Sequence, residues 1–122
     1  MTDMTELLPV GTNGVVHARG AIVPLVPVPA DEVDSGAPRQ GVLELGSVGR
    51  CAAGIWELRA GAVFDTEVDE VFVVISGGAT IELLDENRTV EVKAGDVMRL
   101  VAGTRTRWVV KDHIRKVYIA AE

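Results

Sequence analysis

The sequence predicts a single all-β domain, built as an antiparallel barrel or sandwich. Three observations predict this fold. Short apolar segments recur along the chain, and turns rich in glycine or proline separate them. From Gly11 onward no segment has the periodicity of an amphipathic helix. The 122 residues are enough for one domain with its own hydrophobic core, without a metal or disulfide to hold it together.

The first third of the chain is predicted to be less regular than the rest. Residues 1–14 are expected to form an N-terminal arm, partly flexible, and residues 15–122 the β-barrel domain. Two short apolar segments, 15–18 and 21–23, open the domain. The prolines that follow lack an N–H donor, which confines them to sheet edges or extended segments. An exposed loop is expected at 30–38, which is acidic and rich in turn residues.

The later strands are predicted from β-branched and aromatic residues that stand between turns. Six of them are expected at 41–45, 53–59, 71–76, 97–100, 106–110 and 114–120. The run 71–76 is almost entirely apolar, which predicts a strand buried on both faces. Residues 79–84 and 88–93 alternate in character and predict a hairpin. Turns are expected at 60–61, 77–78, 85–87 and 111–113.

Charge and composition argue against several classes of partner. The net charge of −6 opposes a general affinity for phosphate backbones or anionic membranes, so neither nucleic acid nor membrane is expected as a partner. No apolar run reaches the roughly 18 residues of a membrane span. The acidic N-terminus is unlike a secretory leader, and the one cysteine, Cys51, allows no internal disulfide. We therefore expect a cytoplasmic protein.

Two glycine-bounded segments resemble the motifs of the cupin family. Gly61, Glu70 and Gly77 have the spacing of the first cupin motif, in which Glu70 supplies the glutamate. Gly95-Asp96 and Gly103 match the second motif. Four shorter segments resemble the branch that contains ureidoglycine aminohydrolase and the ethanolamine-utilisation cupins: 54–57, 69–72, 106–108 and 115–118. The resemblance implies a jelly-roll barrel of two facing antiparallel sheets. Because cupins often exchange strands, it also implies a homodimer, with residues 21–28 as a candidate edge strand for a neighbour.

The resemblance further implies a metal held by three histidines and one glutamate, and here the chain departs from the family. Only Glu70 of this set is present. The histidine positions are occupied by other residues, namely Phe64, Asp65, Thr66, Glu67 and Thr106. We therefore expect no metal and no other cofactor. An oxygen-rich site formed by Asp65, Glu67 and Glu70 is the alternative.

The two histidines of the chain, His17 and His113, lie outside both motifs. His113 follows Lys111 and Asp112 in the expected turn before the last strand. No serine is expected to lie where it would complete a relay with Asp112 and His113.

Strand alternation predicts which side chains line the barrel. If Glu70 faces inward, Phe72, Val74 and Ser76 share its face. The candidates for ligand binding are Trp56, Phe72, Thr106, Trp108, Lys116 and Tyr118. Aromatic walls combined with opposite charges suit a small polar ligand with carboxylate, amide or amine groups. In the alternative interpretation, Trp56 and Trp108 are ordinary core residues, and Glu70 with Lys116 forms an internal ion pair.

Three functions are consistent with these residues. The first is a cupin without metal that binds a small polar metabolite. The second is an enzyme of the aminohydrolase, decarboxylase or isomerase type, with Glu70 as proton acceptor and Tyr118 or Lys116 as proton donor. The third is a structural, dimeric barrel without a site. Binding is favoured, because a reaction of the ureidoglycine type would require the missing metal ligands.

Overall fold

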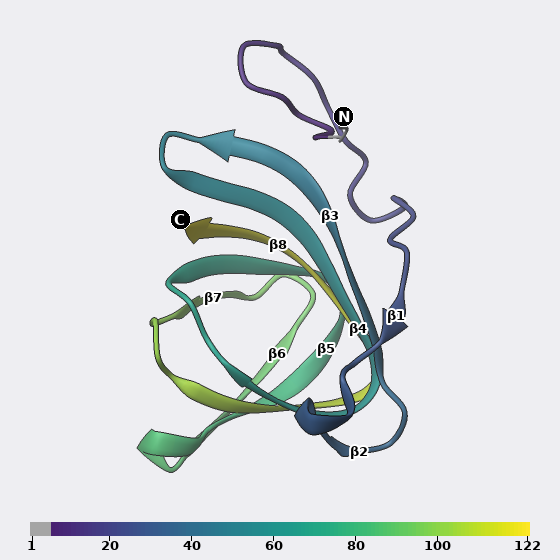
Figure 1. Cartoon of the computed structure of the whole chain (residues 1–122), viewed down its shortest axis with the longest axis vertical. Coiled ribbons are helices and arrows are strands. Elements are labelled where there is room, and N and C mark those ends of the chain that lie inside the picture. The colour runs from purple at the N-terminus through teal and green to yellow at the C-terminus, as the bar shows by residue number, and fades with distance from the viewer. Residues whose placement is uncertain (1–5) are drawn as a thin grey trace.

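Antiparallel strands make up nearly all of the regular structure in the computed structural model, which describes residues 6–122 (Figure 1). The elements, in chain order, are β1 (Val26–Pro27), the 3₁₀ turn η1 (Ala30–Glu32), β2 (Val33–Ser35), β3 (Arg39–Val48), β4 (Cys51–Thr66), β5 (Glu70–Leu83), the 3₁₀ turn η2 (Leu84–Glu86), β6 (Arg88–Lys93), β7 (Val97–Leu100) and β8 (Arg105–Ala121). No α-helix occurs within the described residues, and so none that could cross a lipid bilayer. The predicted all-β, single-domain fold is confirmed.

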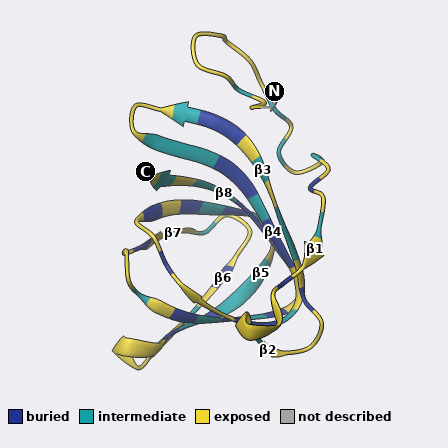
Figure 2. Ribbon diagram, in the orientation of Figure 1, coloured by how far each residue is buried: buried dark blue, intermediate teal, exposed yellow. Residues whose placement is uncertain are grey.

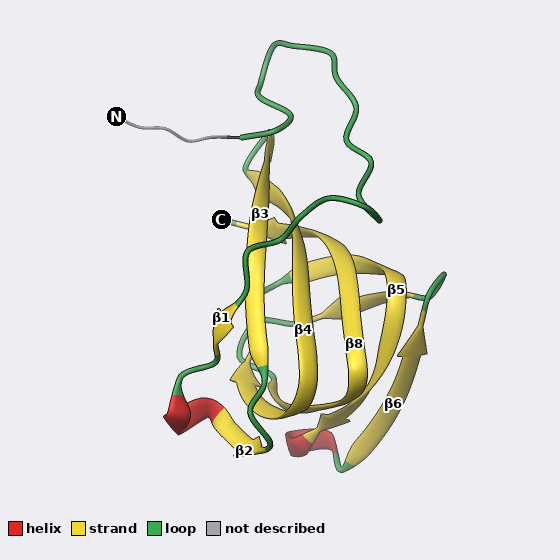
Figure 3. Ribbon diagram, turned by 90° about the vertical axis from the view of Figure 1, so that its right-hand side faces the viewer, coloured by secondary structure: helices red, strands yellow, loops and turns green. Residues whose placement is uncertain are grey.

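The strands form one sheet in the order β1-β3-β4-β8-β5-β6, while β2 pairs with β4 and β7 pairs with β5. Its three central strands, β4, β8 and β5, are 16, 17 and 14 residues long. Figure 3 shows these long strands curving round the barrel side by side. The two layers expected for a jelly roll are therefore the two halves of one continuous, bent sheet.

Glycine bulges, and not turns, allow the long strands to bend. In β4 the pairing register with β8 shifts between Arg59 and Gly61, and Gly61 has φ 148°. In β5 the register with β8 shifts between Gly77 and Thr80, and Gly77 has φ 70°. The turns predicted at 60–61, 77–78 and 111–113 are therefore wrong. The glycine at each of these bulges has a positive φ, as the glycine of many turns does, so glycine in the sequence indicates both.

Three other local predictions have mixed outcomes. The hairpin is confirmed, since β5 and β6 pair from Gly78↔Lys93 to Leu83↔Arg88. The strand at 97–100 is also confirmed, as β7. The run 71–76 is not buried on both faces. Phe72 and Val74 are buried, whereas Val71, which precedes Phe72 and points to the other face, is 38% exposed. The apolar side chains on its outer face reflect the preference of β-branched residues for strands, and they do not indicate burial.

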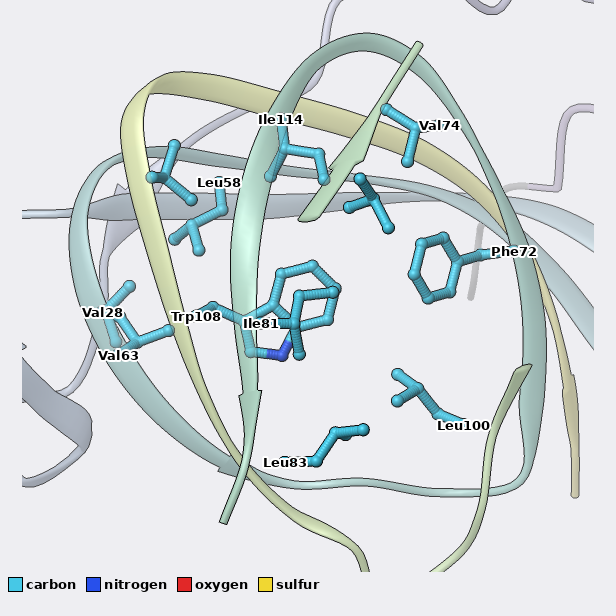
Figure 4. Close-up of a cluster of buried hydrophobic side chains, with 12 residues drawn as sticks. Val28, Leu58, Val63, Phe72, Val74, Ile81, Leu83, Leu100, Trp108 and Ile114 are labelled. Atoms are coloured by element: carbon cyan, nitrogen blue, oxygen red, sulfur yellow. The ribbon is translucent and has the colours of Figure 1, made fainter. Parts of the chain in front are cut away.

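The main hydrophobic core fills the barrel. Figure 4 shows Trp108 at its centre, with Phe72, Ile81 and Leu100 among the surrounding side chains. Buried residues alternate with more exposed ones at the start of β5, whereas β4 carries adjacent buried residues because both of its faces are covered there (Figure 2). Ile81, Leu58 and Ile114 have no solvent exposure. Burying a side chain of this size stabilises the fold by about 1.5–3 kcal/mol.

A second, smaller core lies on the outer side of the barrel wall. Val23, Leu45 and Ile55 are buried there, and side chains of the N-terminal segment pack against them. The apolar segments 15–18 and 21–23 form no strand, in agreement with the lower regularity predicted for this part of the chain. Their apolar residues cover the outer face of the wall without joining its hydrogen-bond ladder.

The N-terminal segment is attached within its own chain. In the predicted arm, Leu8 N–H donates to Leu45 O at 2.6 Å, while residues 1–5 lie outside the described part. Further along, β1 pairs with β3 of the same chain through Val26↔Gln40 and Pro27↔Arg39. The division at residue 14 and the homodimer both stay predictions.

Candidate functional site

A cavity of about 250 Å³ lies inside one end of the barrel. Its lining comprises Val28, Glu32, Gln40, Val42, Trp56, Val63, Phe64, Asp65, Glu67, Val68, Glu70, Trp108, Lys116, Tyr118 and Ala120. The exposed residues among them, which include Glu32, Phe64 and Asp65, mark its mouth. Glu70, Trp108 and Lys116 are buried and form its inner part.

Lys116 lies in a box of aromatic rings at the inner part of this cavity. Its Nζ atom is 4.4 Å from the ring centre of Phe72, 4.7 Å from that of Trp56 and 4.9 Å from that of Trp108. The same atom donates to Glu70 Oε2 at 2.7 Å. Both side chains are more than nine-tenths buried. Cation–π attraction and one carboxylate together replace the water that the ammonium group loses on burial.

Glu67 is the second buried carboxylate. Its Oε2 atom accepts a hydrogen bond from Thr106 Oγ1 at 2.6 Å and another from Trp108 Nε1 at 2.9 Å. Backbone bonds from Glu67 N–H to Thr104 O and from Gly103 N–H to Glu67 O fix the loop that carries it. Trp108 thus belongs to the core and also lines the cavity, and its indole N–H is bonded to Glu67.

Asp65 lies at the mouth of the cavity. Partial burial, followed by the negative charge of Glu67, raises its pKa to about 6. The Thr66 N–H donates to Asp65 Oδ1 at 2.8 Å and only partly offsets this rise. Asp65 therefore exchanges its proton close to neutral pH, which is uncommon for an aspartate.

Tyr118 reaches the cavity from β8. Burial, and then the charges of Glu44 and Glu70, raise its pKa, so the phenol keeps its proton at neutral pH. Gly54 on β4 makes room for the ring, because a Cβ atom there would lie 2.4 Å from the Tyr118 hydroxyl. The aromatic residue and its paired glycine, Gly54↔Tyr118, work as one unit.

The structure brings most of the candidate side chains to this cavity. Trp56, Glu70, Trp108, Lys116 and Tyr118 line it directly. Phe72 and Thr106 lie behind the lining and act through Lys116 and Glu67 respectively.

Ser76 does not belong to this cavity, and the prediction that it shares the face of Glu70 is wrong. The register of β5 with β8 shifts between Val74 and Ser76. One extra residue in a strand turns the following side chains to the opposite face. Ser76 therefore lies on the outer face, where it contacts His113.

Sequence reasoning missed three polar lining residues. Glu32 and Gln40 come from the N-terminal part, where the motifs give no alignment. Glu67 was considered only as a ligand of an oxygen-rich metal site, but it is 6% exposed and bonded to its own chain. Its nearness to Thr106, 39 residues away, left no signal in the sequence.

The charges in the cavity do not balance. Four lining residues are acidic, namely Glu32, Asp65, Glu67 and Glu70, and one, Lys116, is basic. Lys116 is already paired with Glu70. Three carboxyl groups remain without a basic partner within the lining. Crowding of like charges in a partly dehydrated space is costly, and the charge of Glu67 adds to the effect of burial in raising the Asp65 pKa.

The residues present do not fit the metal that the family resemblance implies. Within residues 6–122 no group of three or more His, Cys, Asp or Glu side chains is arranged to hold a metal ion. The motif glutamate, Glu70, is bonded to the Lys116 ammonium group. One carboxylate oxygen of Glu67 accepts hydrogen bonds from both Thr106 and Trp108. The oxygen-rich site of Asp65, Glu67 and Glu70 is therefore not assembled.

Comparison with known proteins places these features among the cupins. A family model described as the EutQ-like cupin domain matches residues 45–118. No curated protein sequence matches the chain.

Several solved structures are similar in fold. The EutQ protein of Clostridium difficile is 20% identical, with a TM-score of 0.67 over 88% of this chain and 85% of its own. A putative ethanolamine utilization protein Q from Salmonella typhimurium is also 20% identical, with a TM-score of 0.59 over 82% of this chain and 95% of its own. The polyketide cyclase RemF of Streptomyces resistomycificus is 18% identical, with a TM-score of 0.61 over 90% of this chain and 80% of its own. At these identities the likeness concerns the fold.

Proposed function

The chain belongs to the EutQ-like cupin family, and we propose that its barrel binds a small polar metabolite that carries an amine, without the help of a metal. The cavity of about 250 Å³ suits a molecule of a few heavy atoms. Its presence favours binding over a purely structural barrel.

The charge imbalance of the cavity carries this proposal. Glu32, Asp65 and Glu67 have no basic partner in the lining, so a positively charged group would relieve their mutual repulsion. A ligand carboxylate would meet the opposite situation, because Glu70 already neutralises Lys116. Of the carboxylate, amide and amine groups expected from the sequence, the amine is therefore the best match.

The aromatic walls support the same ligand class. Lys116 already occupies the box of Trp56, Phe72 and Trp108 from within the chain. A ligand ammonium group would thus bind towards Asp65 and Glu67, while its carbon atoms contact apolar lining residues such as Val63 and Val68.

Tryptophan fluorescence tests this proposal directly, because Trp56 and Trp108 are the only tryptophans of the chain and both line the cavity. We expect butylammonium to shift their emission in a saturable way, at concentrations where butyrate and butyramide do not. The three probes have similar size and differ in charge.

Matched variants make the test specific. Glu67→Gln keeps an oxygen that can accept from Thr106 and Trp108 but removes the negative charge. The double variant Glu67→Gln/Asp65→Asn should weaken butylammonium binding at least about tenfold. Glu91→Gln, exposed and outside this lining, should leave binding unchanged. Equal affinity for butyrate, or ammonium binding that survives the double change, would refute the proposal.

An enzyme remains the second candidate, and one observation favours it. Asp65, with a pKa of about 6, can take up and release a proton near neutral pH at the cavity mouth. Glu70 is less suited to the part of proton acceptor, since the Lys116 ammonium group occupies its Oε2 atom. Tyr118 retains its proton and suits the part of donor. The test uses a metabolite found bound to the protein. If the wild type converts this metabolite, and the Asp65→Asn variant binds it but does not convert it, catalysis would replace binding as the function.

A further inference from the structure

Ser76, His113 and Asp112 form a hydrogen-bonded series on the outer face of the barrel, away from the cavity. Ser76 Oγ lies 2.6 Å from His113 Nε2, and His113 Nδ1 lies 2.5 Å from Asp112 Oδ2. A carboxylate only accepts hydrogen bonds, so Nδ1 carries the imidazole proton. Nε2 is then free to accept the Ser76 hydroxyl proton. The sequence interpretation that no serine completes a relay with Asp112 and His113 is therefore wrong.

Two irregularities in β5 create this series. The bulge between Val74 and Ser76 turns the serine outward, where it pairs with Arg115 on β8. Gly77 follows with φ 70°, and a Cβ atom there would lie 2.0 Å from His113 O and 3.0 Å from His113 Cδ2. Only glycine lets the β8 backbone and the His113 ring come this close to β5.

The series opens onto a cleft of about 270 Å³ that Arg19, Arg59 and Arg115 also line. Glu57 is bonded to both Arg59 and Arg115, at 2.5 Å and 2.6 Å. Among the described residues Arg19 has no carboxylate within ion-pair distance, and Arg59 is about half exposed. Three arginines against the carboxylates of Glu57 and Asp112 leave the cleft with one net positive charge when His113 is neutral.

We propose that Ser76 is an activated nucleophile and that this cleft is an acyl-transfer site for small esters that carry a negative charge. Ser76 Oγ attacks the ester carbonyl carbon and its proton passes to His113 Nε2. The bond from carbon to the leaving oxygen breaks, and the leaving alcohol takes the proton from Nε2. Water then hydrolyses the acyl-serine by the same proton path, which releases the acid and restores the Ser76 hydroxyl. Asp112 is a positioning residue, because it holds the imidazole with Nδ1 protonated.

Covalent labelling tests the nucleophile without knowledge of a natural substrate. The wild-type protein is treated with diisopropyl fluorophosphate, and the site of the adduct is mapped by mass spectrometry. The chain has three serines, Ser35, Ser47 and Ser76. We expect one adduct, on Ser76. Absence of an adduct, or an adduct on Ser35 or Ser47 at a comparable rate, would overturn the proposal.

Variants and esters test the mechanism and the charge preference. His113→Gln should slow labelling by about 100-fold or more, because general-base assistance is lost, while Ser47→Ala should not change it. Asp112→Asn should cause a smaller loss, because Asp112 is 87% exposed and water can take its place beside Nδ1.

Hydrolysis of 4-nitrophenyl hydrogen succinate should be faster than that of 4-nitrophenyl acetate, and Arg19→Gln should reduce this preference. Circular dichroism confirms that each variant is folded. Labelling that is unchanged in folded His113→Gln would refute the relay.

Discussion

Lys116 and Glu70 are the two residues on which the interior of the barrel depends most. Their side-chain charges are more than nine-tenths buried and lie 2.7 Å apart. Removing one partner leaves the other charge buried alone, which typically costs about 3–5 kcal/mol, whereas removing both can be nearly neutral.

We therefore predict that Lys116→Met and Glu70→Gln each lower the free energy of unfolding by several kcal/mol. The double variant should lose much less than the sum of the two single losses. Urea unfolding of the four proteins measures this coupling. Additive losses would show that the two side chains do not depend on each other.

Asp65 makes the stability depend on pH in a direction opposite to that of most aspartates. Its folded-state pKa of about 6 exceeds the ordinary aspartate pKa of 3.8. The folded protein therefore holds this proton more tightly than the unfolded chain, and Asp65 lowers stability as pH rises from about 4 to about 6.

Asp65→Asn should accordingly stabilise the protein at pH 7, by about 1 kcal/mol because Asp65 is exposed enough for solvent to screen its charge. At pH 4 the gain should disappear. Chemical denaturation at both pH values checks this, and an equal effect of Asn at pH 4 and pH 7 would contradict the raised pKa. Butylammonium binding should likewise weaken as the pH falls below about 6.

At this scale the sequence predicted side-chain direction well where strands are regular. Trp108, Lys116 and Tyr118 lie where alternation along one strand places them, and Phe72 shares the inner face with Glu70. The prediction for Ser76 was wrong because a single bulged residue inverts the alternation. The burial of Glu67 was not predicted because its partners, Thr106 and Trp108, come from a strand that is distant in the sequence.

At the scale of elements, the bulges of β4 and β5 determine where the strands bend. Gly77 has a positive φ and lies against the His113 backbone, whereas Gly95 has a positive φ of 99° with nothing within 4 Å of a Cβ atom. Alanine at either position pays for the left-handed conformation, but only at Gly77 does it also collide with backbone.

We predict that Gly77→Ala destabilises the protein by about 1–3 kcal/mol more than Gly95→Ala, because the β5 and β8 backbones must separate. Thermal unfolding of the two variants measures the difference. Similar losses for both would mean that close packing at Gly77 contributes nothing beyond its φ angle.

The boundaries of elements were predictable only where a turn also ends a strand. The hairpin at Asp85–Asn87 was found because polar residues interrupt both strands there, and Asn87 adopts a left-handed conformation with φ 50°. Residues 60–61, 77–78 and 111–113 were expected to be turns, although the strands continue through them. Glycine and short polar runs do not distinguish a bulge from a turn.

At the scale of the molecule, one buried arginine holds the N-terminal segment against the barrel wall. The Arg115 guanidinium group donates to the carbonyl oxygens of Ala18, Arg19 and Ala21, at 2.8, 3.2 and 2.6 Å. It also pairs with Glu57. The outer core of Val23, Leu45 and Ile55 depends on this segment staying in place.

Arg115→Met should therefore loosen residues 16–25 while the barrel stays folded. Hydrogen exchange measured by mass spectrometry should show faster exchange in this segment and in the outer side of β3, with little change in β5 and β6. Faster exchange spread evenly over the chain would mean that Arg115 supports the whole fold and not one segment.

The overall fold was predictable because its signals are local and repeated. Gly61, Glu70, Gly77 and Gly103 stand at fixed intervals that reflect the bends of a small barrel, and the family match covers residues 45–118. The N-terminal part was not predictable, because its residues satisfy the outer face of a wall formed by later strands. Glu32 and Gln40 reach the cavity from this part.

We propose that the barrel cavity selects a small amine by its unbalanced carboxylates and needs no metal to do so. A crystal structure of the protein soaked with butylammonium tests it most directly. We predict the ammonium nitrogen within hydrogen-bonding distance of the Asp65 or Glu67 carboxylate, with Lys116 still paired to Glu70. A metal ion held by these acids, or an amine found only outside the barrel, would contradict the claim.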